Sequence, residues 1–467
     1  MSDWLGEDWL LPTALSRRLY HDVAAPLPII DYHCHLDAAD LADDRRFDTI
    51  TDLWITPDPY KHRAMRMLGV PEAIITGQDT APRVRFEAWA AALPKLLGNP
   101  LHAWAAMELA RTFDTTGPLT PASFDTLTAA LQLPTRSARG LIDRAHVACI
   151  CTSDRLLDDL DKHRLLAASG WATRVLPSLR GDDILAVDAP AYRDWLRQLG
   201  AATGVAVTDF PAFTTAVQRR LDAFAAAGCR LADHSLDGLD EYDHDADPAP
   251  LLDRVLAGQK LDAAQRNALH GGLLRMLAAA YAKRGWVLQL HLGAQRQTST
   301  RLRTLAGPAG GYACLGSPLN VPALARLLDD LERGDALPRV ILYNLNPADH
   351  AAMATLTGSF AADGVPGQVL WGPAWWFNDH ALGIRQHLDT LAHYGLLWTF
   401  PGMTTDSRSL LSMVRHEYFR RLLCGWVGEQ VDAGLMPADD ASLNALVRGM
   451  CHDNARRMLQ LDEEPAT

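Results

Sequence analysis

Short apolar and β-branched runs recur along the chain, and most of them are followed by stretches with helical periodicity. The runs are PIIDYH from Pro28, HVACICT from His146, TRVLPS from Thr173, CRLADH from Cys229, WVLQLH from Trp286, RVILYN from Arg339, QVLWG from Gln368 and LLWTF from Leu396. Several are continuously apolar, which is typical of parallel strands covered on both faces. Eight strands alternating with helices predict an α/β fold closed into a barrel.

One interval breaks this rhythm, because residues 36–145 separate the first predicted strand from the second. They contain amphipathic patterns such as RVRFEAWAAALPKLL from Arg83 and LHAWAAMELARTF from Leu101, which predict helices. We interpret the segment as a helical insertion that caps the mouth of a distorted (β/α)8 TIM barrel. Residues 1–35 then form the N-terminal segment and first strand, and residues 146–467 the remaining barrel. A separate domain is the alternative, although no Ser-, Gly- or Pro-rich linker marks its edges.

The composition is that of a globular protein with a large packed core. The 467 residues are 48% hydrophobic and 21% charged, and the formal net charge is −12. Nucleic-acid phosphates and acidic lipids require clustered Lys and Arg, so we expect neither nucleic-acid nor membrane partners. A small anionic substrate stays compatible with this charge if arginines gather inside the pocket.

The N-terminal residues and the cysteines indicate where in the cell the protein is expected. The first twenty residues lack the basic start and the apolar core of a signal peptide, and no apolar run approaches the roughly 18 residues of a membrane span. Seven cysteines are scattered without paired spacing. We expect a soluble, cytoplasmic protein that forms homo-oligomers. The acidic stretch DGLDEYDHDADPAP from Asp237 is predicted to be a solvated loop rather than a cation site.

Candidate chemistry is sought where the strands end, because active sites of this fold lie at the carboxyl face. The first strand ends in Asp31-Tyr32-His33-Cys34-His35, and residues two apart on a strand point the same way. His33 and His35 can therefore share one metal ion at roughly 2.0–2.1 Å each. His291 ends the fifth strand and is either a third imidazole at the metal or a hydrogen-bonded core histidine.

Charged groups follow the eighth predicted strand. Asp406 and Arg408 offer a carboxylate and a guanidinium almost side by side. A carboxylate beside a metal can be a ligand, a proton carrier or both. The simpler alternative is that Asp406 caps a helix and that Arg408 is a surface charge.

Further polar groups follow other strands at the same end. Arg180 follows the third strand and Arg296 the fifth, so with Arg408 they could grip a carboxylate in bidentate fashion. Each arginine taken alone is better explained as a solvated surface charge. Asp233 ends the fourth strand. Trp375 and Trp376 follow the seventh, where these adjacent tryptophans supply either a sugar-stacking wall or core packing.

Taken together, these segments resemble the uronate isomerases of the amidohydrolase superfamily over nearly the whole chain. The resemblance is carried by long collinear segments rather than by single motifs. They include DYHCHLDAADLADDRRFDTITDLW from Asp31, YKHRAMRMLGV from Tyr60, GWVLQLHLGAQRQTSTRLRTLAGP from Gly285, WWFND from Trp375 and GMTTDSRSLLSMVRHEYFRRLLC from Gly402.

The resemblance implies interconversion of a hexuronate aldose, glucuronate or galacturonate, with its ketose, fructuronate or tagaturonate. His33, His35 and Asp406 would hold a divalent metal, commonly zinc, with His291 close to it. Tyr60 and Asp406 would be the candidates for proton transfer, with Arg408 beside them in the catalytic group. The residues that would line the substrate are Arg180, Asp233, Arg296, Trp375 and Arg408.

The chain departs from the family pattern at one place. The family's usual His-Tyr-Lys-Trp-Arg reads Pro59-Tyr60-Lys61-His62-Arg63 here, so a proline replaces the histidine before the tyrosine. Proline has no side-chain group that shuttles protons. We hypothesise that His62 takes over this catalytic role from three residues away on a helical turn. The alternative is that His62 only packs.

Two other functions compete with isomerisation. Most enzymes of the superfamily are hydrolases that use a metal-bound hydroxide. Two-metal hydrolases usually carry a lysine on the fourth strand, where this chain has Ala232-Asp233-His234, so a mononuclear hydrolase of a carboxylated or sugar-acid substrate is the alternative. A non-catalytic sugar-binding protein is the second, and the presence of His33, His35 and Asp406 argues against it.

Overall fold

Seven of the eight predicted strands form in the computed structural model, which describes residues 4–237 and 246–462. They are β1 (Ile29–Asp31), β2 (Val147–Cys151), β4 (Arg174–Leu176), β6 (Leu231–Leu236), β7 (Val287–Leu292), β10 (Arg339–Asn344) and β11 (Val369–Trp371). Four two-residue strands are added: β3 (Asp154–Arg155), β5 (Leu179–Arg180), β8 (Ala294–Gln295) and β9 (Cys314–Leu315). Most of the acidic stretch predicted as a loop, residues 238–245, lies outside the described residues.

The strands of the barrel are parallel and follow each other in chain order. One ladder has the order β1-β2-β4 and the other β11-β10-β7-β6-β5-β3. β4 pairs with β2, whereas β5 pairs with β3 and β6, so the third barrel strand joins the two ladders. It is interrupted at Pro177, which has no N–H to donate to a ladder. The predicted distorted (β/α)8 barrel is confirmed.

The prediction of an eighth strand from Leu396 is wrong. That run forms a short 3-10 helix, η6 (Leu397–Thr399). Leu396 and Trp398 are 67% and 55% exposed, and only Phe400 at its end is buried, so most of its apolar character does not reflect burial. The eighth position is taken by an irregular segment further along the chain. The Asp406 N–H donates to the His33 carbonyl at 3.0 Å, and the His35 N–H donates to the Ser407 carbonyl at 2.8 Å.

A buried carboxylate ties this segment to the first strand. Asp31 is fully buried and accepts hydrogen bonds from the Thr404 hydroxyl at 2.7 Å, the Thr405 N–H at 2.8 Å and the Thr405 hydroxyl at 2.5 Å. Burial by itself raises the pKa of Asp31, but the nearby His416 imidazole, 3.6 Å away, and hydrogen bonds from Thr405 outweigh it and lower the pKa below its usual value. The carboxylate stays charged. We call Asp31, Thr404 and Thr405 the Asp31 clasp.

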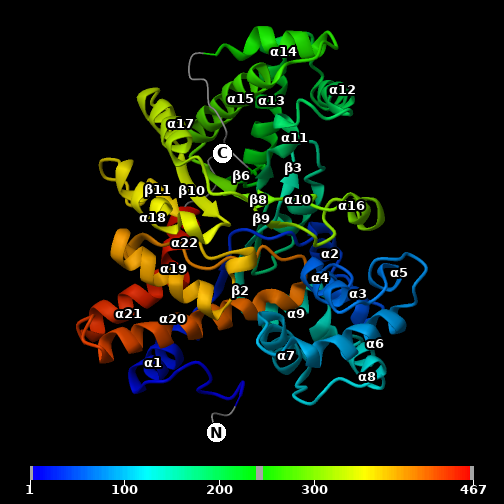
Figure 1. Cartoon of the computed structure of the whole chain (residues 1–467), viewed down its shortest axis with the longest axis vertical. Coiled ribbons are helices and arrows are strands. Elements are labelled where there is room, and N and C mark those ends of the chain that lie inside the picture. The colour runs from blue at the N-terminus through cyan, green and yellow to red at the C-terminus, as the bar shows by residue number, and fades with distance from the viewer. Residues whose placement is uncertain (1–3, 238–245, 463–467) are drawn as a thin grey trace.

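The predicted insertion is helical. Its elements are α2 (Ala38–Ala42), α3 (Ile50–Trp54), α4 (Pro59–Met67), α5 (Glu72–Ile75), α6 (Pro82–Ala92), η2 (Leu93–Leu96), α7 (Pro100–Phe113), α8 (Ser123–Ala130), η3 (Pro134–Arg136) and α9 (Ala138–Arg144). Helices α3 to α8 gather at the lower right of Figure 1. Trp54 and Trp89 of the insertion belong to the same apolar core cluster as Leu288 and Leu290 of the barrel.

The remaining helices follow the barrel strands or lie near the two ends of the chain. They are α1 (Ala14–Arg18), η1 (Leu19–Ala24), α10 (Asp161–Ala168), α11 (Asp182–Leu185), α12 (Tyr192–Thr203), α13 (Phe210–Ala226), α14 (Pro248–Leu256), α15 (Ala263–Lys283), α16 (Thr300–Ala306), α17 (Val321–Arg333), η4 (Pro347–Asp349), α18 (His350–Ser359), η5 (Trp376–Asn378), α19 (Ala381–Tyr394), η7 (Leu410–Met413), α20 (Val414–Asp432), α21 (Asp440–Arg448), η8 (Gly449–Asp453) and α22 (Asn454–Met458). Among the described residues, none of the helices is both long and apolar enough for a membrane span.

A second acid, which is largely but not fully buried, lies at the end of the second barrel strand. Asp154 accepts a hydrogen bond from the Thr152 hydroxyl at 2.7 Å, and His163 lies 3.6 Å away. Burial raises the pKa of Asp154 to about 7 and lowers that of His163 to about 4, so this histidine carries no charge at neutral pH to compensate the carboxylate.

We expect Asp31→Asn to destabilise the fold by about 2–4 kcal/mol, because an amide NH2 would face the donors of the clasp and the charge that they stabilise would be lost. The measurement is the urea midpoint of the far-UV circular dichroism signal. Asp440→Asn, at an exposed partner of Arg18, is the control and should change stability by less than about 0.5 kcal/mol. Equal shifts in the two variants would contradict the expectation.

The raised pKa of Asp154 makes stability depend on pH. The folded state holds this proton more tightly than the unfolded chain, so its contribution is complete below pH 4 and is lost as the pH rises through about 7. Relative to the wild type, Asp154→Asn should gain roughly 2–3 kcal/mol of stability between pH 5 and pH 8. Urea titrations at the two pH values measure the gain, and Asp161→Asn, at an exposed carboxylate, should show none.

Candidate active site

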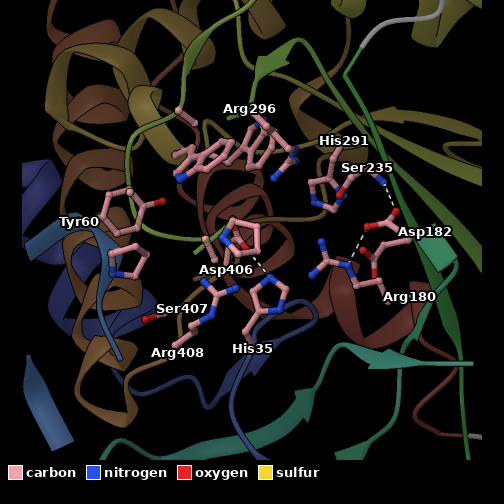
Figure 2. A pocket seen from close by; sticks show the side chains of 18 of the residues that line it. His35, Tyr60, Arg180, Asp182, Ser235, His291, Arg296, Asp406, Ser407 and Arg408 are labelled. Atoms are coloured by element: carbon pink, nitrogen blue, oxygen red, sulfur yellow. Dashed lines mark hydrogen bonds and ion pairs between the residues drawn. The ribbon is translucent and has the colours of Figure 1, made fainter. Parts of the chain in front are cut away.

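A cavity of about 390 Å³ opens at the carboxyl ends of the barrel strands, and α4 of the insertion forms part of its wall. The residues predicted for the site converge here from distant parts of the chain. Those that line the cavity are His33, His35, Tyr60, Arg180, Asp233, His291, Arg296, Trp375, Asp406 and Arg408 (Figure 2). His62 is not among the described residues that line it.

The candidate metal ligands form two overlapping groups. His35 Nε2 lies 3.0 Å and His33 Nε2 lies 3.4 Å from the same oxygen of Asp406. His33 also belongs to a group with Asp233 and His291, and in each group the candidate ligand atoms lie within 4.8 Å of one another. Asp406 has a φ of 48°, a region that a non-glycine residue rarely adopts, which is typical of functional sites.

The residues of these groups fit a divalent cation. Among the described residues, the buried Nδ1 atoms of His33 and His291 and Oδ1 of Asp233 have no hydrogen-bond partner. Buried polar atoms are normally paired, and imidazole nitrogens with carboxylate oxygens suit several divalent metals. The structure therefore supports a divalent metal site at the end of the first strand.

The electrostatics of the site keep Asp406 ionised and His35 neutral, whereas for His33 burial, which lowers the pKa, is outweighed by the Asp406 and Asp233 carboxylates, which raise it. Burial raises the pKa of Asp406, but hydrogen bonds from His33 and His35 outweigh it and hold the pKa well below its usual value. Burial lowers the pKa of His35 to about 4, so this imidazole is neutral at pH 7. A charged carboxylate and a neutral imidazole are the forms that coordinate metals.

Tyr60 reaches the cavity from the first turn of α4. Asp58 caps this helix by accepting from the N–H groups of Tyr60 at 2.8 Å and Lys61 at 3.3 Å. Pro59 occupies the first helical position, where its fixed φ and missing N–H are tolerated. Burial, with the nearby Asp406 charge, raises the pKa of Tyr60 well above its usual value, so the phenol keeps its proton at neutral pH.

The structure does not support the hypothesis that His62 replaces the missing histidine. Its side chain is 8% exposed and lies outside the described lining of the cavity, whereas Pro59 and Tyr60 line it. Burial lowers the pKa of His62 to about 4. The arrangement favours the alternative that His62 packs in the insertion.

The three predicted arginines reach into the cavity from different elements (Figure 2). Arg180 donates through Nε to Asp182 at 2.8 Å, and Asp182 also accepts from the Ser235 N–H at 2.7 Å. Arg296 lies over the Trp376 ring at 5.1 Å. Arg408 is exposed.

Sequence reasoning missed several residues of the cavity wall. Asp182 lies two residues after Arg180 and accepts a hydrogen bond from its guanidinium. This short spacing in the sequence is the signal that could have identified it. Phe377 extends the wall formed by the adjacent tryptophans Trp375 and Trp376, with successive stacked rings 5.3 and 5.6 Å apart. Arg63 also lines the cavity and donates to the Ala313 carbonyl at 2.8 Å, a contact between distant segments that no local pattern predicts.

A parallel barrel with a His-x-His pair at the end of its first strand and an aspartate on its last segment defines a class of metal-dependent barrel enzymes, consistent with the amidohydrolase superfamily. A family model described as Glucuronate isomerase matches residues 1–459. The chain belongs to this family, so it is an isomerase, and the hydrolase alternative is not favoured.

Relatives and solved structures agree with this assignment. A uronate isomerase from Salmonella typhimurium strain LT2 is 42% identical over 465 residues, covering 98% of this chain and 99% of that protein. The crystal structure of a uronate isomerase from Thermotoga maritima superposes with a TM-score of 0.90 at 28% identity, covering 97% of this chain and 99% of the other. A glucuronate isomerase from Caulobacter crescentus shares the fold, with a TM-score of 0.91 at 24% identity over 98% of both chains.

Removing one candidate ligand should abolish tight metal binding. We expect His35→Ala to retain less than about one tenth of the metal that the wild type carries after dialysis, because two side chains rarely hold a divalent ion tightly. Elemental analysis of the purified protein measures the content. His62→Ala is the matched control and should keep the wild-type content. A loaded His35→Ala protein would remove His35 from the ligands.

Proposed function

We propose that the protein interconverts a hexuronate aldose and its ketose, glucuronate with fructuronate or galacturonate with tagaturonate. The observation that carries the proposal is a single cavity in which a candidate metal group, a tyrosine and three arginines face one another. An open-chain hexuronate has a carbonyl at one end and a carboxylate at the other. The cavity supplies matching groups for both ends.

The arginines are the proposed partners of the anionic end. The protein as a whole is negative, with a formal charge of −12, so attraction of a carboxylate depends on local positive charge. Arg180, Arg296 and Arg408 provide it, and guanidinium groups bind carboxylates in a bidentate manner. Trp375 and Asp233 would complete the contacts with the sugar hydroxyls.

His33, His35 and Asp406 are the proposed metal ligands, with His291 beside them, and we propose zinc because two imidazoles and a carboxylate match its preferences. A bound cation would polarise the oxygens on the first two carbons of the substrate and so favour loss of the proton from the second carbon.

Tyr60 and Asp406 are the proposed proton carriers. Isomerisation takes a proton from the second carbon and returns one to the first, while a second proton moves between the two oxygens. The Asp406 carboxylate is ionised and can accept the carbon proton. The Tyr60 phenol is protonated, which suits it to donate to a substrate oxygen.

An assay with glucuronate and galacturonate tests the proposal. We expect formation of the ketose from at least one of them, detected by a coupled reductase. In heavy water, solvent deuterium in the product would indicate exchange at the enediol stage. A protein that carries metal and forms no ketose from either uronate would contradict the proposed reaction.

Tyr60→Phe should lower kcat by about 100-fold or more, because the change removes only the proton that the phenol donates. KM should change by less than about threefold, since the ring still lines the cavity. Steady-state kinetics on the preferred uronate measure both constants. Tyr192→Phe, which removes a buried hydroxyl bonded to the Ile184 carbonyl outside the cavity, is the control and should leave kcat unchanged. Normal turnover of Tyr60→Phe would exclude the acid role.

We also propose that the protein is a cytoplasmic homo-oligomer. All seven cysteines lie in the described residues and are unpaired, which suits a reducing compartment. Tyr394, Leu396 and Trp398 are each more than half exposed within one short stretch and would be covered in an assembly. Light scattering measures the mass in solution.

A further inference from the structure

One buried arginine lies next to the cavity but, in the part of the chain that the structure describes, is not one of the residues lining it. Arg415, the second residue of α20, is 3% exposed. Its Nη1 donates to the Thr405 carbonyl at 2.6 Å, and its Nη2 forms an ion pair with Asp379. Its guanidinium carbon lies 4.5 Å from the centre of the Trp104 ring. One side chain thus contacts three segments far apart in sequence.

Each of these three segments carries part of the proposed site. Thr405 belongs to the Asp31 clasp and directly precedes Asp406. Asp379 follows the aromatic wall formed by Trp375, Trp376 and Phe377. Trp104 of α7 packs edge-on against Tyr60, with ring centres 6.3 Å apart at 85°.

The charges of this contact cannot easily be replaced. Asp379 is 1% exposed, so its carboxylate depends on the guanidinium for compensation. Burial disfavours the charged form of Arg415, but Asp379 outweighs burial and raises the pKa of the arginine above its usual value. Only a planar guanidinium can bond to a carbonyl and a carboxylate while stacking on an indole.

We propose that Arg415 is a positioning residue for the isomerisation, which fixes Tyr60 of the insertion and Asp406 of the barrel relative to each other and to the aromatic wall. The inference rests on the proposed roles of Tyr60 and Asp406. Arg415 does not contact substrate and exchanges no proton in this proposal. It acts through the Thr405 carbonyl, through Asp379 and through Trp104.

Arg415→Lys keeps a buried positive charge but cannot make the three contacts together. With saturating metal, kcat should fall at least about 30-fold and KM should change by less than about threefold. The dissociation constant for Zn²⁺, measured by competition with a chromogenic chelator, should weaken by about 10-fold, because Asp406 loses the anchor on its preceding carbonyl. Asp379→Asn removes the same ion pair from the other side and should have similar effects if Arg415→Lys fails to fold.

Arg420→Lys is the matched control. Arg420 lies in the same helix, is 5% exposed and donates to the Ala24, Leu27 and Pro28 carbonyls, away from the cavity. This variant should lose stability yet keep kcat and Zn²⁺ affinity within about twofold of the wild type.

The proposal is overturned if the Arg415→Lys and Asp379→Asn proteins match Arg420→Lys in both kcat and Zn²⁺ affinity. The proposed function fails on its own if the wild-type protein converts neither uronate. In that case the Zn²⁺ affinities of the variants still test whether Arg415, through the Thr405 carbonyl, positions Asp406. Combining Arg415→Lys with Asp379→Asn should cost no more activity than the worse single change, because both remove one interaction.

Discussion

The hydrogen bonds of the buried Asp31 carboxylate hold the first barrel strand against the segment that occupies the eighth position, and the site depends on this contact. β1 is only three residues long, and the eighth position has no regular strand, so ladder pairing alone would fix their register weakly. The three donors of Thr404 and Thr405 fix it through a charged acceptor. A shift of one residue would turn His33 and His35 away from Asp406.

Burial and pairing then separate the protonation states of the groups in the cavity. Asp406 stays ionised because the two imidazoles outweigh its burial, whereas Tyr60 keeps its proton because burial and the Asp406 charge act in the same direction. An ionised carboxylate and a protonated phenol thus lie in one cavity. Arg180, Arg296 and Arg408 bring guanidinium groups into this cavity, beside the aspartates that also line it.

The insertion contributes residues to the site. It supplies Tyr60 on the first turn of α4, and Arg63 of the same helix contacts the chain segment that carries Ala313. On the barrel side, Trp376 has a φ of 53°, an unfavourable conformation for a bulky residue, and its ring stacks between neighbouring aromatic rings. Arg415 contacts Trp104 of the insertion and Thr405 and Asp379 of the barrel, so we expect its substitution to disturb the site on both sides.

The sequence by itself determined seven of the strands, the helical insertion and ten of the residues that line the cavity, because period-two and apolar runs depend on local chemistry and because strand ends of a barrel share one face. It could not place the eighth position, since most of the apolar run from Leu396 is not buried and the segment beside β1 is held by a side chain rather than by a strand pattern. It also left His62 open, and only the helix orientation placed that residue outside the cavity lining. Arg63 and Arg415 bond to partners that are distant in the sequence, and tertiary structure alone decides such contacts.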